Sequence, residues 1–201
     1  MSIDDLIEKY QIPDKPDFYG TTTHKFKKDI WRYFSNEMFK ELTFVEFGTS
    51  RGYTSLIMSY LFKLVHTINR QDSVDAKVMS KGIANIDYHI FDLYNSTTSD
   101  WDKIRSGDVF MIDAVHSYNA VMIDVNSALN FLETKLQKKV FIFDDYGAYP
   151  EVKKAVDKLI NDKTLEVVVT VGEEQGYKYG ENAGDTDRIL KSYEGLICLE
   201  V

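Results

Sequence analysis

The octapeptide VEFGTSRG at positions 45–52 is the most informative segment for the fold. It continues an apolar run that begins at Leu42 and is typical of a buried strand, and Gly48 ends that run. The following segment, Tyr53–Phe62, has helical character. Glycine at positions 48 and 52 lets the backbone turn sharply and approach a ligand closely. The segment therefore predicts a strand, a glycine turn and a helix.

The same alternation continues along the chain. The further predicted strands are Leu64–Ile68, Ile86–Phe91, Asp108–Ile112 and Lys139–Phe143, and the further predicted helices are Asp72–Lys81, Tyr118–Leu132 and Glu151–Ile160. Five alternations indicate a parallel sheet with helices on both faces. Leu165–Val171 and Gly195–Val201 both read as strands without a helix between them, which favours an antiparallel hairpin. We therefore predict an α/β, doubly wound, mostly parallel seven-stranded sheet with an antiparallel C-terminal hairpin.

One domain is expected over residues 1–201, with a helical N-terminal cap (1–40) and the α/β core (41–201). The cap contains predicted helices at Ile3–Tyr10 and Lys25–Phe39, separated by Pro13 and Pro16. The long polar connector Gly172–Ser192 is either a disordered loop or a functional flap.

The composition and charge of the chain exclude several classes of site and partner. Of 201 residues 44% are hydrophobic, so a packed core is expected, and a net charge of −8 argues against a nucleic-acid partner. The single cysteine, Cys198, excludes an internal disulfide and a cysteine metal cluster. The acidic start is unlike a signal peptide, and the apolar stretch Leu56–Val65 is too short to span a membrane. We expect a soluble, cytoplasmic protein without a membrane partner.

Acidic residues follow two strands of the predicted sheet. Asp113 comes after Asp108–Ile112, and Asp144 and Asp145 come after Lys139–Phe143. The ends of neighbouring parallel strands lie about 5 Å apart. Converging carboxylates repel one another and require a cation, and hard oxygen ligands suit Mg²⁺, Ca²⁺ or Mn²⁺ better than zinc. The alternative is that Asp113 and Asp144 are turn residues or helix caps.

The glycine turn lacks both the dinucleotide fingerprint and the phosphate-loop pattern. It resembles the first motif of the class I S-adenosylmethionine-dependent methyltransferases, an acid followed by two spaced glycines. The resemblance implies a Rossmann-like methyltransferase fold that binds S-adenosylmethionine. It implies a cofactor site lined by Glu46, Gly48, Ser50, Gly52, Asn69, Asp92 and Asp113. Asn69 stands where that family usually has a ribose-binding acid. Asp92 matches the acid near the adenine, or is a turn residue at a strand end.

The aspartates resemble those of the metal-dependent O-methyltransferases of the catechol and macrolide-sugar types. That resemblance implies Asp113, Asp144 and Asp145 as ligands of a divalent metal, with Mg²⁺ favoured. The segment 113–118, with Asp124 further on, is also similar to the cephalosporin-hydroxylase-related group. His116 is the candidate catalytic base, because its pKa suits proton transfer near neutrality. Alternatively it supports a metal ligand from outside the coordination sphere.

These observations predict metal-assisted methyl transfer to a hydroxyl of a small molecule. A cofactor-binding protein without catalysis and a metal-dependent phosphoester hydrolase are the alternatives. A homodimer is a candidate assembly, since similar enzymes are often dimers. Further candidate site residues flank the core, namely Tyr19, His24, Tyr177, Tyr179 and Arg188.

Overall fold

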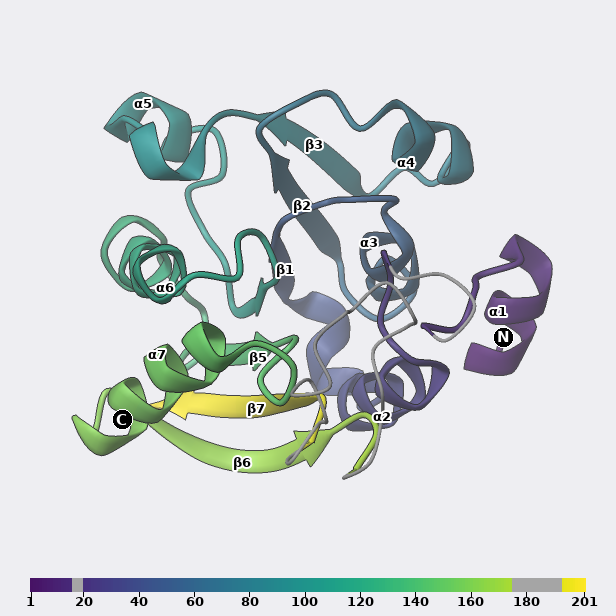
Figure 1. Ribbon diagram of the computed structural model, residues 1–201. Coiled ribbons are helices and arrows are strands. Elements are labelled where there is room, and N and C mark those ends of the chain that lie inside the picture. Colours follow the sequence, from purple (N-terminus) through teal and green to yellow (C-terminus); the bar gives the residue numbers. More distant parts are fainter. Residues whose placement is uncertain (16–19, 175–192) are drawn as a thin grey trace.

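The computed structural model describes residues 1–15, 20–174 and 193–201, and its centre is one seven-stranded sheet (Figure 1). The strands are β1 (Thr43–Phe47), β2 (Leu64–Asn69), β3 (Ile86–Ile90), β4 (Val109–Ile112), β5 (Val140–Phe143), β6 (Leu165–Val171) and β7 (Gly195–Glu200). Their order across the sheet is β3-β2-β1-β4-β5-β7-β6. The first five strands are parallel, and β7 runs antiparallel to both β5 and β6. The predicted fold class is confirmed.

Helices precede the sheet and connect its strands. They are α1 (Ile3–Tyr10), α2 (His24–Phe34), α3 (Tyr53–Met58), α4 (Val74–Met79), α5 (Thr98–Trp101), α6 (Tyr118–Phe131) and α7 (Pro150–Asn161), with 3₁₀ turns η1 (Glu37–Glu41) and η2 (Leu93–Asn95). The helix predicted for Lys25–Phe39 is wrong in its last five residues. α2 ends at Phe34, and the Asn36 side chain accepts a hydrogen bond from the Met38 amide, which starts η1 instead. The α3 helix is also shorter than predicted.

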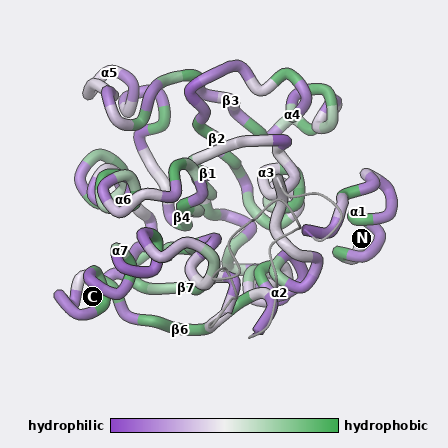
Figure 2. The backbone as a smooth tube through the Cα atoms, in the orientation of Figure 1, coloured by the Kyte–Doolittle hydropathy of each residue, from purple (hydrophilic) through white to green (hydrophobic). Residues whose placement is uncertain are grey.

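The two faces of the sheet bury separate apolar clusters. On one face α6 and α7 pack over β1, β4 and β5, with Trp101 of α5 joining them. On the other face Phe26, Ile30 and Phe34 of α2 pack against Phe44 and neighbouring strand residues. Figure 2 shows apolar strands running between helices of mixed character. Burying each large apolar side chain contributes roughly 1.5–3 kcal/mol, so these faces hold the strand ends in place.

The strand-to-helix turn after β1 depends on left-handed backbone. Gly48, Ser50 and Gly52 have φ of 99°, 45° and 75°. A Cβ at Gly48 would overlap the backbone carbonyl of Asp113, so only glycine fits where the β1 turn meets the end of β4. The turn is thereby packed directly against the first of the predicted metal ligands.

None of the helices in the described part of the chain has both the length and the apolar character that crossing a membrane requires.

Candidate functional site

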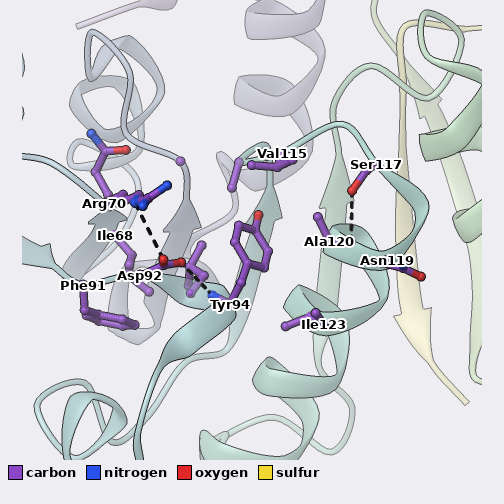
Figure 3. Close-up of a pocket in the computed structure, with 14 residues that line it drawn as sticks. Ile68, Arg70, Phe91, Asp92, Tyr94, Val115, Ser117, Asn119, Ala120 and Ile123 are labelled. Carbon is purple, nitrogen blue, oxygen red and sulfur yellow. Dashed lines mark hydrogen bonds and ion pairs between the residues drawn. The ribbon is translucent and has the colours of Figure 1, made fainter.

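The carboxyl ends of β1, β2 and β4 border a cavity of about 400 Å³ (Figure 3). Open parallel sheets bind ligands beyond these strand ends. Arg70 and Asp92 lie on one side and Ala120 and Ile123 on the other, with Tyr94 between them, and Asn69 also lines the cavity. The lining is mostly apolar with a few polar groups, which is typical of a site for a small organic ligand.

Three predicted cofactor residues line this cavity, namely Gly48, Asn69 and Asp92. The Asn69 amide nitrogen donates to Ser73 Oγ (3.0 Å) and to the Gln71 carbonyl (3.1 Å), which orients the side chain. Asp92 accepts hydrogen bonds from Asn95 Nδ2 (2.9 Å) and from the Tyr94 amide (3.1 Å), and these bonds lower its pKa. Asp92 is therefore both an ionised wall residue and the N-cap of η2.

Glu46 is buried at the end of β1 and points toward hydroxyl groups. Its Oε2 accepts hydrogen bonds from Thr67 Oγ1 (2.6 Å) and from Ser55 Oγ. Burial raises the pKa of Glu46 to about 8, against the opposing effect of these bonds. Together with Gly48, Ser50 and Gly52, Glu46 lines a space of about 20 Å³, room for about one water molecule.

A second cavity, of about 230 Å³, lies at the ends of β4 and β5. It is lined by Lys15, Gly20, Thr21, Ser50, Asp113, Ala114, His116, Asp144, Asp145 and Tyr149. Ala114 borders both this cavity and the 400 Å³ cavity. Gly48 lines the 400 Å³ cavity and the small space at the glycine turn, and Asp113 lines that space and the 230 Å³ cavity. The two cavities therefore lie next to each other along the edge of the sheet.

His116 lies between two of the predicted metal ligands. Its Nε2 is 3.2 Å from Asp145 Oδ2 and 3.5 Å from Asp113 Oδ1, and its ring stacks on Tyr149 at 4.3 Å between centroids. Desolvation lowers the pKa of His116, but the neighbouring aspartates outweigh it and raise the pKa overall. One donor atom each from Asp113, His116 and Asp145 lie within 4.8 Å of one another.

Asp144 lines the same cavity, and desolvation with the charge of Asp145 raises its pKa well above the usual value. Its Oδ1 is buried and has no hydrogen-bond partner among the described residues. An orphaned carboxylate oxygen beside two further aspartates is a donor set that fits a hard divalent cation. Burial also raises the pKa of Asp113, so the cluster favours bound positive charge.

Lys15 is a site residue that sequence reasoning missed. Its ammonium is buried 2.8 Å from Asp145 Oδ1 and 3.6 Å from Glu194 Oε1. Desolvation lowers the pKa of Lys15, but Asp144 and Asp145 raise it more, so the group stays charged. Nothing in the segment Pro13–Pro16 distinguishes this lysine from a surface residue. The excess of acids at the strand ends was the available indication that a cation from elsewhere would approach them.

Other predicted residues lie apart from this centre. His24 begins α2, its Nε2 is 2.9 Å from the Ile12 carbonyl oxygen, and it lines neither of the two cavities described above. Asp124 is fully buried in α6 and likewise lines neither. Tyr19, Tyr177, Tyr179 and Arg188 are outside the described residues.

Searches of protein-family models and of curated proteins find no match to this sequence. Solved structures do match. An S-adenosylmethionine-dependent O-methyltransferase from Thermotoga maritima aligns over 100% of this chain and 72% of its own, at 12% identity and a TM-score of 0.63. An O-methyltransferase from Bacillus cereus, in complex with S-adenosylhomocysteine, covers 99% and 88% at 12% identity and 0.62.

An rRNA methylase from Streptococcus thermophilus also matches, over 86% of this chain and 92% of its own, at 13% identity and a TM-score of 0.54. At such low identities the agreement concerns the fold and leaves the acceptor unassigned. The strand order and the antiparallel β7 indicate the same fold as these structural matches. The chain has the Rossmann-like fold of the class I S-adenosylmethionine-dependent methyltransferases.

Proposed function

We propose that this protein transfers the methyl group of S-adenosylmethionine to a hydroxyl of a small molecule, with the help of a divalent cation such as Mg²⁺. The observation that carries the proposal is the pair of adjoining cavities. One is apolar with Asn69 and Asp92 on its wall, and the other contains the carboxylates of Asp113, Asp144 and Asp145. A methyl donor and an acceptor that occupied them would meet near Ala114.

The first cavity fits an adenosyl group. Asp92 is ionised and, with Asn69, offers polar atoms at the ends of β3 and β2, where ribose hydroxyls could be bound. Phe91 and Leu93 supply apolar surface for a base. Gly48 lines both this cavity and the small space at the glycine turn, so the amino-acid part of the ligand would lie against the backbone of that turn. These assignments follow from the positions of the residues along the sheet edge.

The second cavity fits a small polar acceptor and a cation. Asp113, Asp144 and Asp145 would hold the cation, which when bound lowers the pKa of a hydroxyl. His116 would act as the base in its neutral form, with Nε2, the atom between Asp113 and Asp145, free of a proton and taking up that of the hydroxyl. The acceptor oxygen then forms the bond to the methyl carbon while the carbon–sulfur bond breaks and its electron pair stays on sulfur.

The test is calorimetric titration of S-adenosylhomocysteine into the full chain, with Mg²⁺ and then with EDTA. We expect saturable binding, weakened at least about tenfold in Asp92→Ala, because an ionised wall group is lost. Asp162→Asn is the matched control, since Asp162 pairs with Lys158 on the surface and lines neither of the two cavities of the proposed site. Absence of binding in both conditions would contradict the proposal and favour the phosphoester hydrolase.

Turnover separates catalysis from binding alone. With a panel of small catechols and sugars, we expect methylated product that requires Mg²⁺ and is lost in Asp113→Asn. Tight S-adenosylhomocysteine binding without any product across the panel would instead favour a cofactor-binding protein.

A further inference from the structure

A second group of metal-ligating side chains lies at the outer edge of the sheet. His66 is on β2, and Asp87 and His89 are on β3. The register pairs His66 with Asp87 and Ile68 with His89, so the three side chains share one face. None of them lines the cavities described above. His66 is three residues, roughly 10 Å, along β2 from Asn69.

The donor atoms of this group already converge. His66 Nδ1 is 2.9 Å from His89 Nε2 and 3.7 Å from Asp87 Oδ2, and all three atoms lie within 4.8 Å of one another. Two ligands on a tetrahedral zinc ion, each bound at about 2.0–2.2 Å, lie about 3.4 Å apart. Small side-chain adjustments, without a change of backbone, would bring these atoms to that spacing.

The exposure of the three residues leaves a route for an ion. His66 is buried, His89 is half-buried, and the Asp87 side chain is 56% exposed. An ion held by all three would be covered by the sheet on one side and open to water at its remaining position. Lys103 is the cation that faces His89, and its ammonium is bonded to Asp100 at 3.2 Å, which moderates its repulsion.

We propose that His66, Asp87 and His89 form a binding site for a zinc-class transition metal ion, separate from the methyl-transfer site. Two imidazoles and one carboxylate suit Zn²⁺, Co²⁺, Ni²⁺ or Cu²⁺ and are a poor set for Mg²⁺ or Ca²⁺. The ion would join the edge strand β3 to β2. The inference does not depend on the proposed function.

The environment of the two imidazole rings also favours metal binding. Burial, with the neighbouring His89, lowers the pKa of His66 to about 4, and burial also lowers the pKa of His89. Both shifts favour the neutral imidazole, which is the form that binds a metal. If no ion binds, His66 and His89 only form a hydrogen bond between β2 and β3. This structural role is the alternative that the experiment has to distinguish from metal binding.

The test is titration of the EDTA-stripped full chain with Co²⁺, followed by its visible absorption, and with Zn²⁺ in competition with a chromogenic chelator. Asp87→Asn removes an exposed ligand without disturbing the core, and His89→Ala removes a second. His116→Ala is the matched control, because it removes the histidine of the other cluster. The thermal midpoint of each variant in EDTA verifies its folding.

We expect the wild type and His116→Ala to bind one equivalent at this site, with a Co²⁺ spectrum and a rise in thermal midpoint. Asp87→Asn and His89→Ala should lose that rise and bind at least about tenfold more weakly, since even an outer partner of a metal ligand has an effect of this size. The same affinity in Asp87→Asn, His89→Ala and wild type would overturn the proposal. Loss of the metal only in His116→Ala would overturn it as well.

Discussion

Lys15 places a permanent positive charge where a divalent cation is expected. Its ammonium contacts Asp145 at 2.8 Å inside the second cavity. In Lys15→Met the carboxylates no longer have the ammonium beside them. Because a few kcal/mol of repulsion between the ammonium and Mn²⁺ is removed, we expect Mn²⁺ to bind at least about tenfold more tightly. A titration of Mn²⁺ followed by electron paramagnetic resonance measures the affinity.

The same variant should be less stable in EDTA by about 3–5 kcal/mol, because a buried carboxylate loses its partner. Added Mn²⁺ should restore part of that loss, as shown by urea unfolding. Lys158→Met, which removes an exposed partner of Asp162, is the control and should change neither quantity measurably. Unchanged Mn²⁺ affinity in Lys15→Met would show that the ammonium and the cation do not share Asp145.

Gly48 and Gly82 form a matched pair, with φ of 99° and 91°. A Cβ at Gly82 meets open space, whereas at Gly48 it overlaps the Asp113 carbonyl. We expect Gly82→Ala to lower the free energy of unfolding by about 1–2 kcal/mol through backbone strain alone. Gly48→Ala should cost more and should abolish S-adenosylhomocysteine binding. Equal effects of the two substitutions on both measurements would contradict this account of the turn.

At the level of elements, α6 carries a buried acid. Both carboxylate oxygens of Asp124 lack a hydrogen-bond partner among the described residues. Burial raises the pKa of Asp124 to about 8, against a smaller opposing effect of Tyr94. The folded state therefore holds a proton that the unfolded chain releases above about pH 4. Between pH 4 and 8 this group makes the protein less stable as pH rises.

The variant Asp124→Asn should remove that dependence. For one proton the slope is at most about 1.4 kcal/mol per pH unit. Urea unfolding at pH 5, 6, 7 and 8 should show a flatter profile for the variant, which becomes more stable than the wild type at pH 8. The variant should keep a second, similar contribution from Glu46, whose pKa is also about 8, so its profile becomes flatter but not flat. Parallel profiles for the two proteins would be inconsistent with a buried, protonated Asp124.

The strands were predictable because most are compact apolar runs and Ile86–Phe91 alternates, and β1 to β7 begin and end within about one residue of expectation. Helix ends were harder, since α2 ends through one side-chain bond at Asn36 that periodicity does not reveal. The clustering of Asp113 and Asp145 followed from parallel strand ends. The contact of Lys15 with Asp145 depends on the path of the N-terminal segment across the sheet edge, and the pairing of His66 with His89 depends on the register of β2 and β3. A single sequence specifies neither.

On the scale of the whole molecule, ligand binding should raise the free energy of unfolding and with it the thermal midpoint. The first cavity contacts residues from β1 through α6, so a ligand there binds the folded sheet and not the unfolded chain. At 100 times its dissociation constant such a ligand adds about 2.7 kcal/mol. For a chain of this size S-adenosylhomocysteine should raise the thermal midpoint by about 5–11 °C. Calorimetric binding without any thermal shift would contradict binding to the folded sheet alone.

The position of β7 affects how the sheet is completed during synthesis. β7 is the last strand of the sheet to leave the ribosome, yet it lies between β5 and β6. Until it arrives, β5 has an open edge and β6 has no neighbour, so the strand that precedes Asp144 and Asp145 is exposed to pairing with other chains. Nascent chains stalled before Gly195 should therefore bind chaperones and aggregate, and the acidic cavity should form only once β7 has left the ribosome.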